Sequence, residues 1–259
     1  MPLHIASINS GSNGNCYYIG NGSEAVLIDA GISCRETERR MARLGLRMSD
    51  VKAIFISHEH TDHTKGVEVI SRKYKIPVYI SNETYLNSRV SLEPGLIHHF
   101  HAGKPVHAGN FRIDPFPKWH DAAEPHSFTI ASDGITVGVF TDIGISCDHV
   151  KTHLSRCHAA FLEANYDETM LENGHYPRYL KRRISGAEGH LSNDQALDLF
   201  LSHKPPFLQL LVLSHLSREN NRPKLVHDLF SQNANGVRIE VASRYEESGV
   251  WRVESCNRH

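Results

Sequence analysis

The sequence lacks paired cysteines. Five are present, none spaced as CxxC, at Cys16, Cys34, Cys147, Cys157 and Cys256. An odd and scattered set argues against a disulfide framework and against a zinc site built from thiolates. We therefore expect each cysteine to be a small hydrophobic residue in the interior.

Long apolar stretches and a net charge of either sign are also missing. No segment approaches the roughly 20 apolar residues that span a bilayer, so we expect no membrane contact. The opening MPLHIASINSGSNGN has neither the basic nor the apolar region of a secretion signal, and we expect a cytoplasmic protein. The formal net charge is −1, so any contact with nucleic acid must come from a local basic patch.

Histidine, in contrast, is abundant, with 19 copies. The motif HEHTDH places His58, His60, Asp62 and His63 within six positions, directly after the apolar run 53–56. In an extended chain His58 and His60 point to the same side. A buried carboxylate needs a partner such as a cation. The cluster therefore indicates a metal site of imidazole and carboxylate ligands rather than structural zinc.

Several other segments repeat one layout, an apolar run of β type that ends at a polar residue. These end residues are Asp29, His58, His120, Asp142 and His215. Near-continuous apolar runs of this length are typical of strands buried on both faces. Pro115 and Pro117 weaken the run before His120 as a regular strand.

Helical patterns alternate with these strands. They cover 34–44, 65–74, 192–203 and 222–232. Ser33 and Glu36 form a capping-box pattern before the first helix, which Gly45 would end. Ser192 is a good N-cap, and Pro223 is tolerated in a first turn. The alternation predicts a layered α/β fold, which we interpret as a single domain over residues 1–259 with two related halves packed face to face.

The first segment, HIASINSGSNGNCYYIG, predicts strand, glycine-rich turn and strand. Gly11 and Gly14 would supply conformations that other residues reach only with strain. Two interpretations stay open for this turn. It is either a plain hairpin, or its backbone N–H groups help to hold an anion, in which case Ser12 and Asn13 contact substrate.

The motifs together resemble the metallo-β-lactamase superfamily. LIDAG, HEHTDH, KWHDA, FTDIG and LSHLSREN follow one another in that family's order between residues 24 and 215. The resemblance implies an αββα four-layer sandwich of the metallo-β-lactamase type, with two divalent metal ions at one edge of the paired sheets. Asp29 would be a carboxylate that orients the metal site.

The resemblance also implies a ligand set. It comprises His58, His60 and His120 for one metal, Asp62, His63 and His215 for the other, and Asp142 as a bridge. His126 is the rival to His120, which the HDA context favours. Two adjacent cations would activate a shared bridging water and stabilise the developing oxyanion. Zn²⁺, Mn²⁺ and Fe²⁺ all suit such ligands.

An aspartate at the bridging position makes the chain resemble the phosphodiesterase, thioesterase and lactonase branches. The lactamases proper have a cysteine at that position. SGSNGN, LEANYD and GHLSN resemble motifs of the nuclease-like branches. By this analogy His190 would be the general acid and Glu163 would hold its imidazole, with Asp29 and Asp62 completing the catalytic set. The alternative is that GHLSN is only a helix start, with His190 in a loop.

Basic residues crowd the segment before GHLSN. They contact phosphate or form a solvated helix face. The candidate substrate-binding residues are therefore Ser12, Asn13, Arg178, Lys181, Arg182, Arg183 and Ser217.

The whole motif set most closely resembles the YycJ/WalJ-like subfamily. This implies a metal-dependent exonuclease that degrades DNA from its 5′ end, with DNA a more natural partner than RNA. The chain has no room for the inserted domain of larger nuclease relatives and shows no long protruding arm. Two alternatives stay open, a hydrolase of cyclic phosphodiesters, lactones or thioesters, and a non-catalytic regulatory protein that binds partners through a metal-bearing fold.

Overall fold

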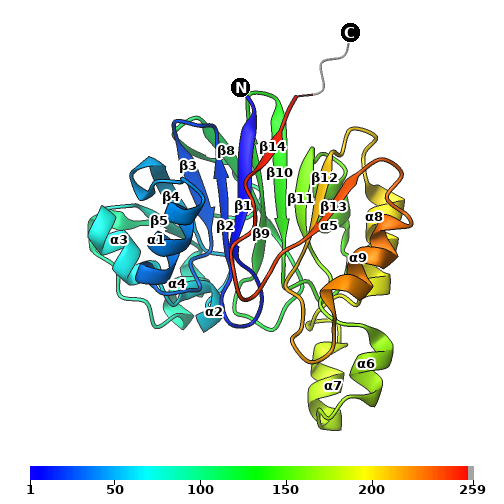
Figure 1. Ribbon diagram of the computed structural model, residues 1–259. Coiled ribbons are helices and arrows are strands. Elements are labelled where there is room, and N and C mark those ends of the chain that lie inside the picture. The colour runs from blue at the N-terminus through cyan, green and yellow to red at the C-terminus, as the bar shows by residue number, and fades with distance from the viewer. Residues whose placement is uncertain (256–259) are drawn as a thin grey trace.

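The computed structural model describes residues 1–255, and within them two seven-stranded sheets lie face to face (Figure 1). The first sheet, in spatial order, consists of β14 (Trp251–Val253), β1 (Leu3–Asn9), β2 (Cys16–Gly20), β3 (Ala25–Ile28), β4 (Val51–Phe55), β5 (Val78–Ile80) and β6 (Ile97–His99). The second consists of β13 (Arg238–Val241), β12 (Leu210–Ser214), β11 (Ala159–Glu163), β10 (Ile135–Phe140), β9 (His126–Ser132), β8 (Phe111–Pro117) and β7 (Val106–Ala108).

The two sheets repeat one pattern of pairing. In the first sheet the pairs from β14 to β3 are antiparallel and those from β3 to β6 are parallel. In the second sheet the pairs from β7 to β10 are antiparallel and those from β10 to β13 are parallel. This agreement confirms the expectation of two related halves.

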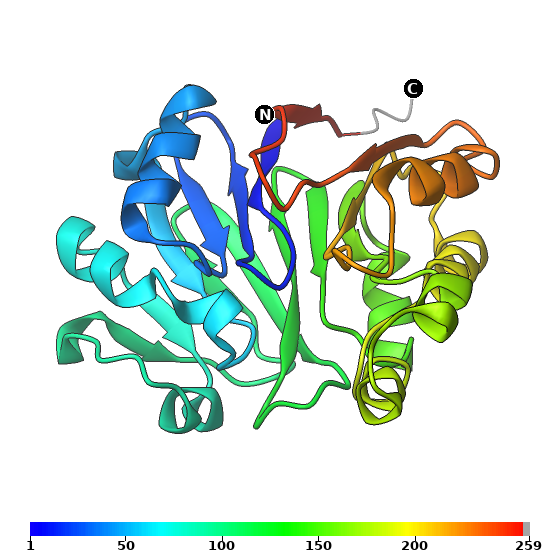
Figure 2. The same cartoon turned by 60° about the horizontal axis from the view of Figure 1, so that its bottom comes forward.

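Helices cover the outer faces of both sheets, as Figure 2 shows from a second direction. The first half contains α1 (Cys34–Arg43), α2 (Thr61–Thr64), α3 (Val67–Tyr74) and α4 (Asn82–Asn87). The second half contains α5 (Asp148–Leu154), α6 (Glu168–Asn173), α7 (Arg178–Ile184), α8 (Asn193–His203) and α9 (Pro223–Ser231). Short 3₁₀ turns lie at Met48–Asp50 and Pro94–Leu96.

Three hydrophobic clusters hold these layers together. The central cluster joins the inner faces of both sheets, for example Val26 of β3 and Phe128 of β9. The second packs α5, α8 and α9 on the second sheet, and the third packs α1 and α3 on the first. Burial of apolar surface at all three boundaries is the main stabilising term. The expected αββα sandwich is therefore confirmed.

The predicted helix caps form. The Ser33 and Ser192 hydroxyls accept hydrogen bonds from the N–H groups of Glu36 and Gln195. The Ser192 cap is a full capping box, whereas the Glu36 carboxylate binds Arg39 and Arg40 instead. The prediction of a reciprocal box at Ser33 is therefore wrong.

The run before His120 is a regular strand despite its prolines. β7 pairs only with the start of β8, so within residues 1–255 the side of β8 that faces away from β9 has no strand partner beyond Ile113. The carbonyl of Pro115 points to that side, where it accepts a hydrogen bond from the Gly103 N–H (2.9 Å). Since the missing N–H of Pro115 faces the same way, no ladder bond is lost.

Three of the cysteines are buried as expected, namely Cys16, Cys34 and Cys157. Cys147 is half-buried, so the prediction is wrong for this residue. Cys256 lies outside the described residues.

A short helical pair, α6 and α7, projects below the edge of the sandwich (Figure 1). The basic segment predicted from the sequence is α7 itself. None of the helices within residues 1–255 combines the length and apolar character that crossing a bilayer requires.

Candidate metal centre

The candidate ligands lie together where strands of both sheets end. Asp29 follows β3, Asp142 follows β10 by two residues, and His215 follows β12. All three adopt left-handed backbone conformations, with φ of 60°, 55° and 57°. Such conformations are uncommon outside glycine and cluster at functional sites. The backbone therefore turns sharply as each strand ends.

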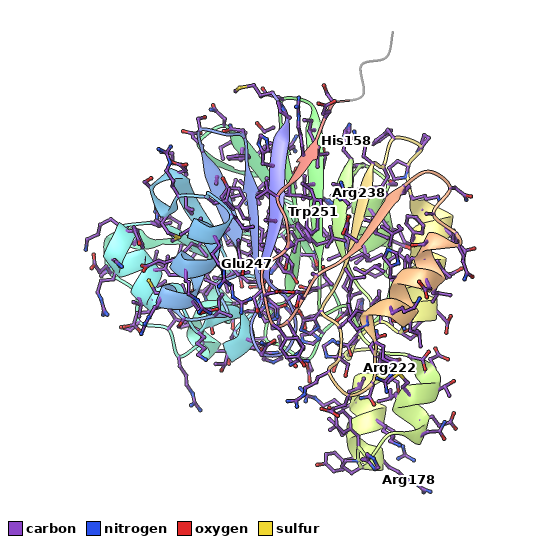
Figure 3. The ribbon with its side chains drawn as sticks, in the orientation of Figure 1. His158, Arg178, Arg222, Arg238, Glu247 and Trp251 are labelled. Atoms are coloured by element: carbon purple, nitrogen blue, oxygen red, sulfur yellow. The ribbon has the colours of Figure 1, made fainter. Side chains whose placement is uncertain are left out.

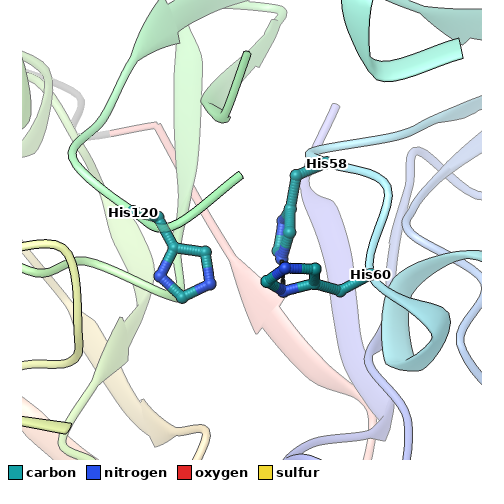
Figure 4. A group of neighbouring side chains, drawn as sticks. All are labelled: His58, His60 and His120. Atoms are coloured by element: carbon teal, nitrogen blue, oxygen red, sulfur yellow. Dashed lines mark hydrogen bonds between the residues drawn. The ribbon is translucent and has the colours of Figure 1, made fainter. Parts of the chain in front are cut away.

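The first group of ligands consists of three imidazoles. His58 and His60 come from the segment between β4 and α2, and His120 comes from the loop after β8 (Figure 4). His58 Nε2 lies 3.1 Å from His60 Nδ1, and the His120 ring centroid lies 4.9 Å from that of His58. The ligand nitrogens of the three are within 4.8 Å of one another. Two different sheets thus supply one three-nitrogen site.

The second group contains Asp62, His63 and His215, whose ligand atoms also lie within 4.8 Å of one another. Asp62 Oδ2 is 3.6 Å from His63 Nε2 and 3.8 Å from His215 Nε2. Asp142 lies between the groups. Its carboxylate is 3.1 Å from His63 Nε2, 3.4 Å from His215 Nε2 and 3.9 Å from His120 Nε2.

Two buried atoms of this cluster show that it fits cations. Among the described residues, none is aligned to form a hydrogen bond with the buried atoms Asp142 Oδ2 and His215 Nε2, although His63 Nε2 lies 3.1 Å from the first and Asp142 Oδ1 lies 3.4 Å from the second. Buried polar atoms without partners are rare and costly in proteins. Burial alone would lower the pKa of His215, but Asp142, Asp62 and Glu163 raise it to about 10. A convergent set of imidazoles and carboxylates with unmatched buried atoms is suited to divalent metal ions.

Asp29 holds the cluster from behind. Its buried carboxylate lies 2.7 Å from His63 Nδ1 and accepts hydrogen bonds from the Ser57 N–H and hydroxyl, both at 2.8 Å. Burial would lower the pKa of His63, but the carboxylates of Asp29, Asp142 and Asp62 raise it well above its usual value. Asp29 therefore fixes which ring nitrogen of His63 faces the cluster, as such partners commonly do for metal ligands.

The glycine of LIDAG permits a close approach of two segments. A Cβ on Gly31 would lie 1.6 Å from the Asp62 carbonyl oxygen, which is too close for any side chain. That carbonyl accepts a hydrogen bond from the Asn15 N–H (2.7 Å), and the Asn15 side chain reaches His63 Nε2 (3.1 Å). The glycine-rich turn after β1 is thus part of the site wall.

His190 and Glu163 form the pair predicted from the sequence. The His190 Nδ1–Glu163 Oε1 distance is 2.8 Å, and His215 Nδ1 shares the same oxygen at 3.0 Å. The other oxygen accepts the N–H groups of Ile143 (2.7 Å) and Leu191 (3.3 Å). Burial would raise the pKa of Glu163, but His190 and His215 lower it to about 2. Glu163 is therefore an anionic hydrogen-bond acceptor that orients both imidazoles.

Lys118 is a buried cation that the sequence analysis missed. It is only 6% exposed, and its ammonium donates a hydrogen bond to the Thr141 carbonyl (2.7 Å), next to Asp142. Burial lowers the pKa of this ammonium, while Asp142, Asp29 and Glu163 oppose that effect. Its place two residues before His120, on the same face of an extended chain, was the available signal.

The cluster opens into a cleft of about 890 Å³ lined by His60, Asp62, His120, Asp142, His190 and His215. Of the candidate substrate-binding residues, Ser12 and Arg183 line this cleft. Arg183 donates a hydrogen bond to Asp121 (2.6 Å), beside His120.

The structure does not bring the other substrate-binding candidates into the cleft. Asn13 donates to the Arg244 carbonyl, and Ser217 lines a separate hollow of about 320 Å³. Arg178 lies at the tip of the projecting helical pair (Figure 3), where the Lys181 ammonium binds the Glu172 carbonyl. Arg182 faces neighbouring hollows beside α7.

His126, the rival of His120, is buried elsewhere. Its Nδ1 lies 2.8 Å from the Glu124 carbonyl, and its ring packs edge-on against Phe100. None of the potential metal-binding groups found within residues 1–255 includes it.

The sequence profile of the beta-lactamase superfamily domain matches residues 24–215, a span that includes every candidate ligand. The chain belongs to this metallo-β-lactamase superfamily, and it is a metal-dependent hydrolase. Within the superfamily it is a YycJ/WalJ-like protein.

Two curated relatives support that placement. The chain is 33% identical to exodeoxyribonuclease YycJ of Bacillus anthracis over 264 residues, which cover 100% of this chain and 95% of the relative. It is 32% identical to exodeoxyribonuclease WalJ of Streptococcus pneumoniae serotype 2 over 223 residues, covering 84% and 83% of the two chains.

Among solved structures, the metallo-beta-lactamase fold protein YhfI from Bacillus subtilis aligns with a TM-score of 0.73 at 15% identity. The alignment covers 97% of this chain and 100% of that chain. It confirms the fold.

Proposed function

We propose that the protein is a dinuclear-metal phosphodiesterase that degrades DNA from its 5′ end. We also propose that it acts in the cytoplasm. The observation that carries this proposal is His190, which lines the cleft beside the ligand cluster while Glu163 holds its Nδ1. The names of the two curated relatives support DNA as the substrate. The resemblance of the sequence motifs to the YycJ/WalJ-like subfamily supports degradation from the 5′ end.

His58, His60 and His120 would hold one cation, and Asp62, His63 and His215 the other, with Asp142 shared between them. When bound, two divalent ions such as Zn²⁺ or Mn²⁺ would lower the pKa of the attacking water and stabilise charge on the phosphoryl oxygens. His63 is kept in one orientation by Asp29, and Asp142 by the strained turn after β10.

Hydrolysis adds water across one P–O bond of the substrate. The water oxygen bonds to phosphorus, and the oxygen of the departing nucleoside leaves with the bond electrons and needs a proton. Because Glu163 occupies His190 Nδ1, the other ring nitrogen is the one that can donate this proton. Arg183, at the cleft wall, would neutralise a phosphate oxygen.

The test uses metal-loaded protein and DNA labelled at one end. Early release of labelled mononucleotides from the 5′-labelled strand, with slow shortening of the 3′-labelled strand, is the expected result. A lactone, a thioester and a cyclic phosphodiester should be poor substrates. Hydrolysis of one of these without any DNA cleavage would replace the proposal by a small-molecule hydrolase. Binding of metals without turnover of any substrate would favour a regulatory protein.

The number of metals is tested separately. Elemental analysis of the loaded protein should give two ions per chain. Asp142→Asn should bind fewer ions, because it removes the shared charge, whereas Asp148→Asn on the exposed start of α5 should bind as many as wild type.

A further inference from the structure

Trp119 is an exposed aromatic residue directly beside a candidate metal ligand. It is 52% exposed, whereas both neighbours, Lys118 and His120, are buried. Adjacent side chains of an extended segment point to opposite sides, so His120 faces the cluster and Trp119 faces the surface. The Trp119 carbonyl accepts a hydrogen bond from the Gly144 N–H (2.8 Å), which fixes the chain at this point.

The Trp119 ring lines a hollow of about 470 Å³ beside the main cleft. The other lining residues are Asp121, Arg182, Arg183, Gly186, Ala187 and Glu188. The walls are tied together, because the Asp121 N–H donates to the Glu188 carbonyl (3.1 Å). A Cβ on Gly144 would lie only 1.9 Å from the Ala187 carbonyl oxygen, so these two segments also meet closely. The hollow is therefore built into the fold.

The hollow adjoins the cleft at one side chain. Arg183 lines both, and its guanidinium is held by Asp121 at 2.6 Å. Asp121, Arg183 and His190 also share a small recess between the two. A chain molecule that leaves His190 along this wall therefore reaches Arg183 first and Trp119 next.

The charges of the hollow are balanced. Arg183 is paired with Asp121, the Arg182 guanidinium forms no ion pair within the described part of the chain, and the Glu188 carboxylate also lines the wall. The hollow therefore has no net positive charge that would attract anions in general. The hollow instead combines the flat ring of Trp119 with two guanidinium groups, that of Arg183 in an ion pair and that of Arg182 without one. This combination suits a ligand that has both an aromatic face and a phosphate.

From this arrangement we propose that Trp119 is a stacking platform for a nucleobase of single-stranded DNA, with Arg183 and Arg182 contacting the phosphate between that base and the metals. The inference rests on the proposed function and deepens it, since it places the strand on the α7 side of the cleft. Stacking on an aromatic ring tolerates every base, as an exonuclease that acts on any sequence requires.

A fluorescence titration tests the contact. The chain has two tryptophans, and Trp251 is buried in the central core. In a metal-loaded His190→Ala background, which should cleave slowly, oligothymidylate should quench the emission to saturation. The same background with Trp119→Phe retains only Trp251 and should show no quenching. Equal quenching of both proteins, or none in either, would overturn the inference.

Kinetics separate this inference from the proposed function. Trp119→Ala should raise KM for single-stranded DNA about tenfold with little change in kcat, and Trp119→Phe should recover most of the loss. The rate of hydrolysis of bis(p-nitrophenyl) phosphate should be unchanged, because this substrate is too small to reach the metal centre and Trp119 at the same time. Leu201→Ala, an exposed apolar change near the far end of α8, is the control.

An unchanged KM in an enzyme that cleaves DNA would refute only the stacking contact. An equal loss on both substrates would also refute it, because it would show damage to the metal centre. Failure of the wild-type protein to cleave DNA while it hydrolyses the small diester would refute the proposed function and this inference together.

Discussion

His190 touches the rest of the protein in a way that leaves one ring nitrogen available. Its Nδ1 is 2.8 Å from Glu163, and its side chain is 21% exposed at the cleft. We expect His190→Ala to lower kcat on DNA by about a hundredfold or more, because the departing oxygen then lacks a proton donor. Metal content, measured by elemental analysis, should stay at the wild-type value.

The acid role has a specific signature. The loss should be much smaller with bis(p-nitrophenyl) phosphate, whose leaving group needs no proton. His227→Ala on the exposed face of α9 is the matched control and should behave as wild type. An equal loss on good and poor leaving groups would contradict general-acid catalysis by His190.

Lys118 is a buried cation that partly balances the buried carboxylates of Asp142, Asp29 and Glu163. Lys118→Met should lower the free energy of unfolding of the metal-free protein by about 2 kcal/mol, because the Thr141 carbonyl loses its partner and Asp142 loses a nearby cation. The loss should be smaller with metals bound. Urea unfolding with and without chelator, beside exposed Lys52→Met, measures both values. A larger loss in the loaded protein would contradict this role.

Elements from the two ends of the chain meet at a single arginine of α1. Arg40 is buried, and its guanidinium donates to the Ile8 carbonyl (3.1 Å), Asn9 Oδ1 (2.8 Å) and the Tyr245 carbonyl (2.9 Å). Its Nε donates to Glu36 at 2.7 Å. Arg40→Met should lower the free energy of unfolding by about 3 kcal/mol, since these acceptors lose their donors. Arg39→Ala, which changes a largely exposed side chain, should cost much less.

The ion pairs of Glu36 with Arg39 and Arg40 should make the free energy of unfolding depend on pH in a predictable direction. Hydrogen bonds from Arg39 and Arg40 lower the pKa of Glu36 to about 2, from 4.5. A depressed carboxyl pKa gives stability that is present above pH 4.5 and is lost as the pH falls towards 2. The stability difference between wild type and Glu36→Gln should therefore narrow over that range. A difference that stays constant down to pH 2 would contradict the assignment.

Elements also show how far the sequence could be interpreted. The strands that precede Asp29, His58, His120, Asp142 and His215 were predicted because near-continuous apolar runs carry a strong pattern. Other short elements, such as α2, α4 and β5, were missed, since packing against neighbours rather than local pattern creates them. The basic run was predicted either to contact phosphate or to form a solvated helix face. Only Arg183 reaches the cleft, because the direction of a short exposed helix is set by its tertiary contacts.

More of the candidate site than of the surrounding fold could be predicted from the sequence. The candidate ligands stand in motifs that are visible along the chain, and the structure brings their side chains together. Asn15, Ser57 and Lys118 were not predicted, because each acts on a residue from another segment. Such partners become visible only once the two sheets are packed.

In the molecule as a whole, the central hydrophobic cluster and the cluster of candidate metal ligands are each shared by both sheets. The central hydrophobic cluster combines residues of both. The candidate ligands lie in the segments that follow β4 on one side and β8, β10 and β12 on the other. Neither half can keep its inner face buried alone. We therefore propose that the chain unfolds as one domain, in a single cooperative transition.

Metal ions should strengthen this coupling, because the candidate ligands of each proposed site come from both halves. Ligands that bind only the native state stabilise it by about 2.7 kcal/mol at a concentration of 100 Kd. Chelation should therefore lower the midpoint of urea unfolding, while circular dichroism and the emission of Trp251 in a Trp119→Phe variant still change together. Wild-type protein reloaded with metal should regain the original midpoint. Two separated transitions after chelation would show that each sheet is stable without the other, and would contradict the single-domain proposal.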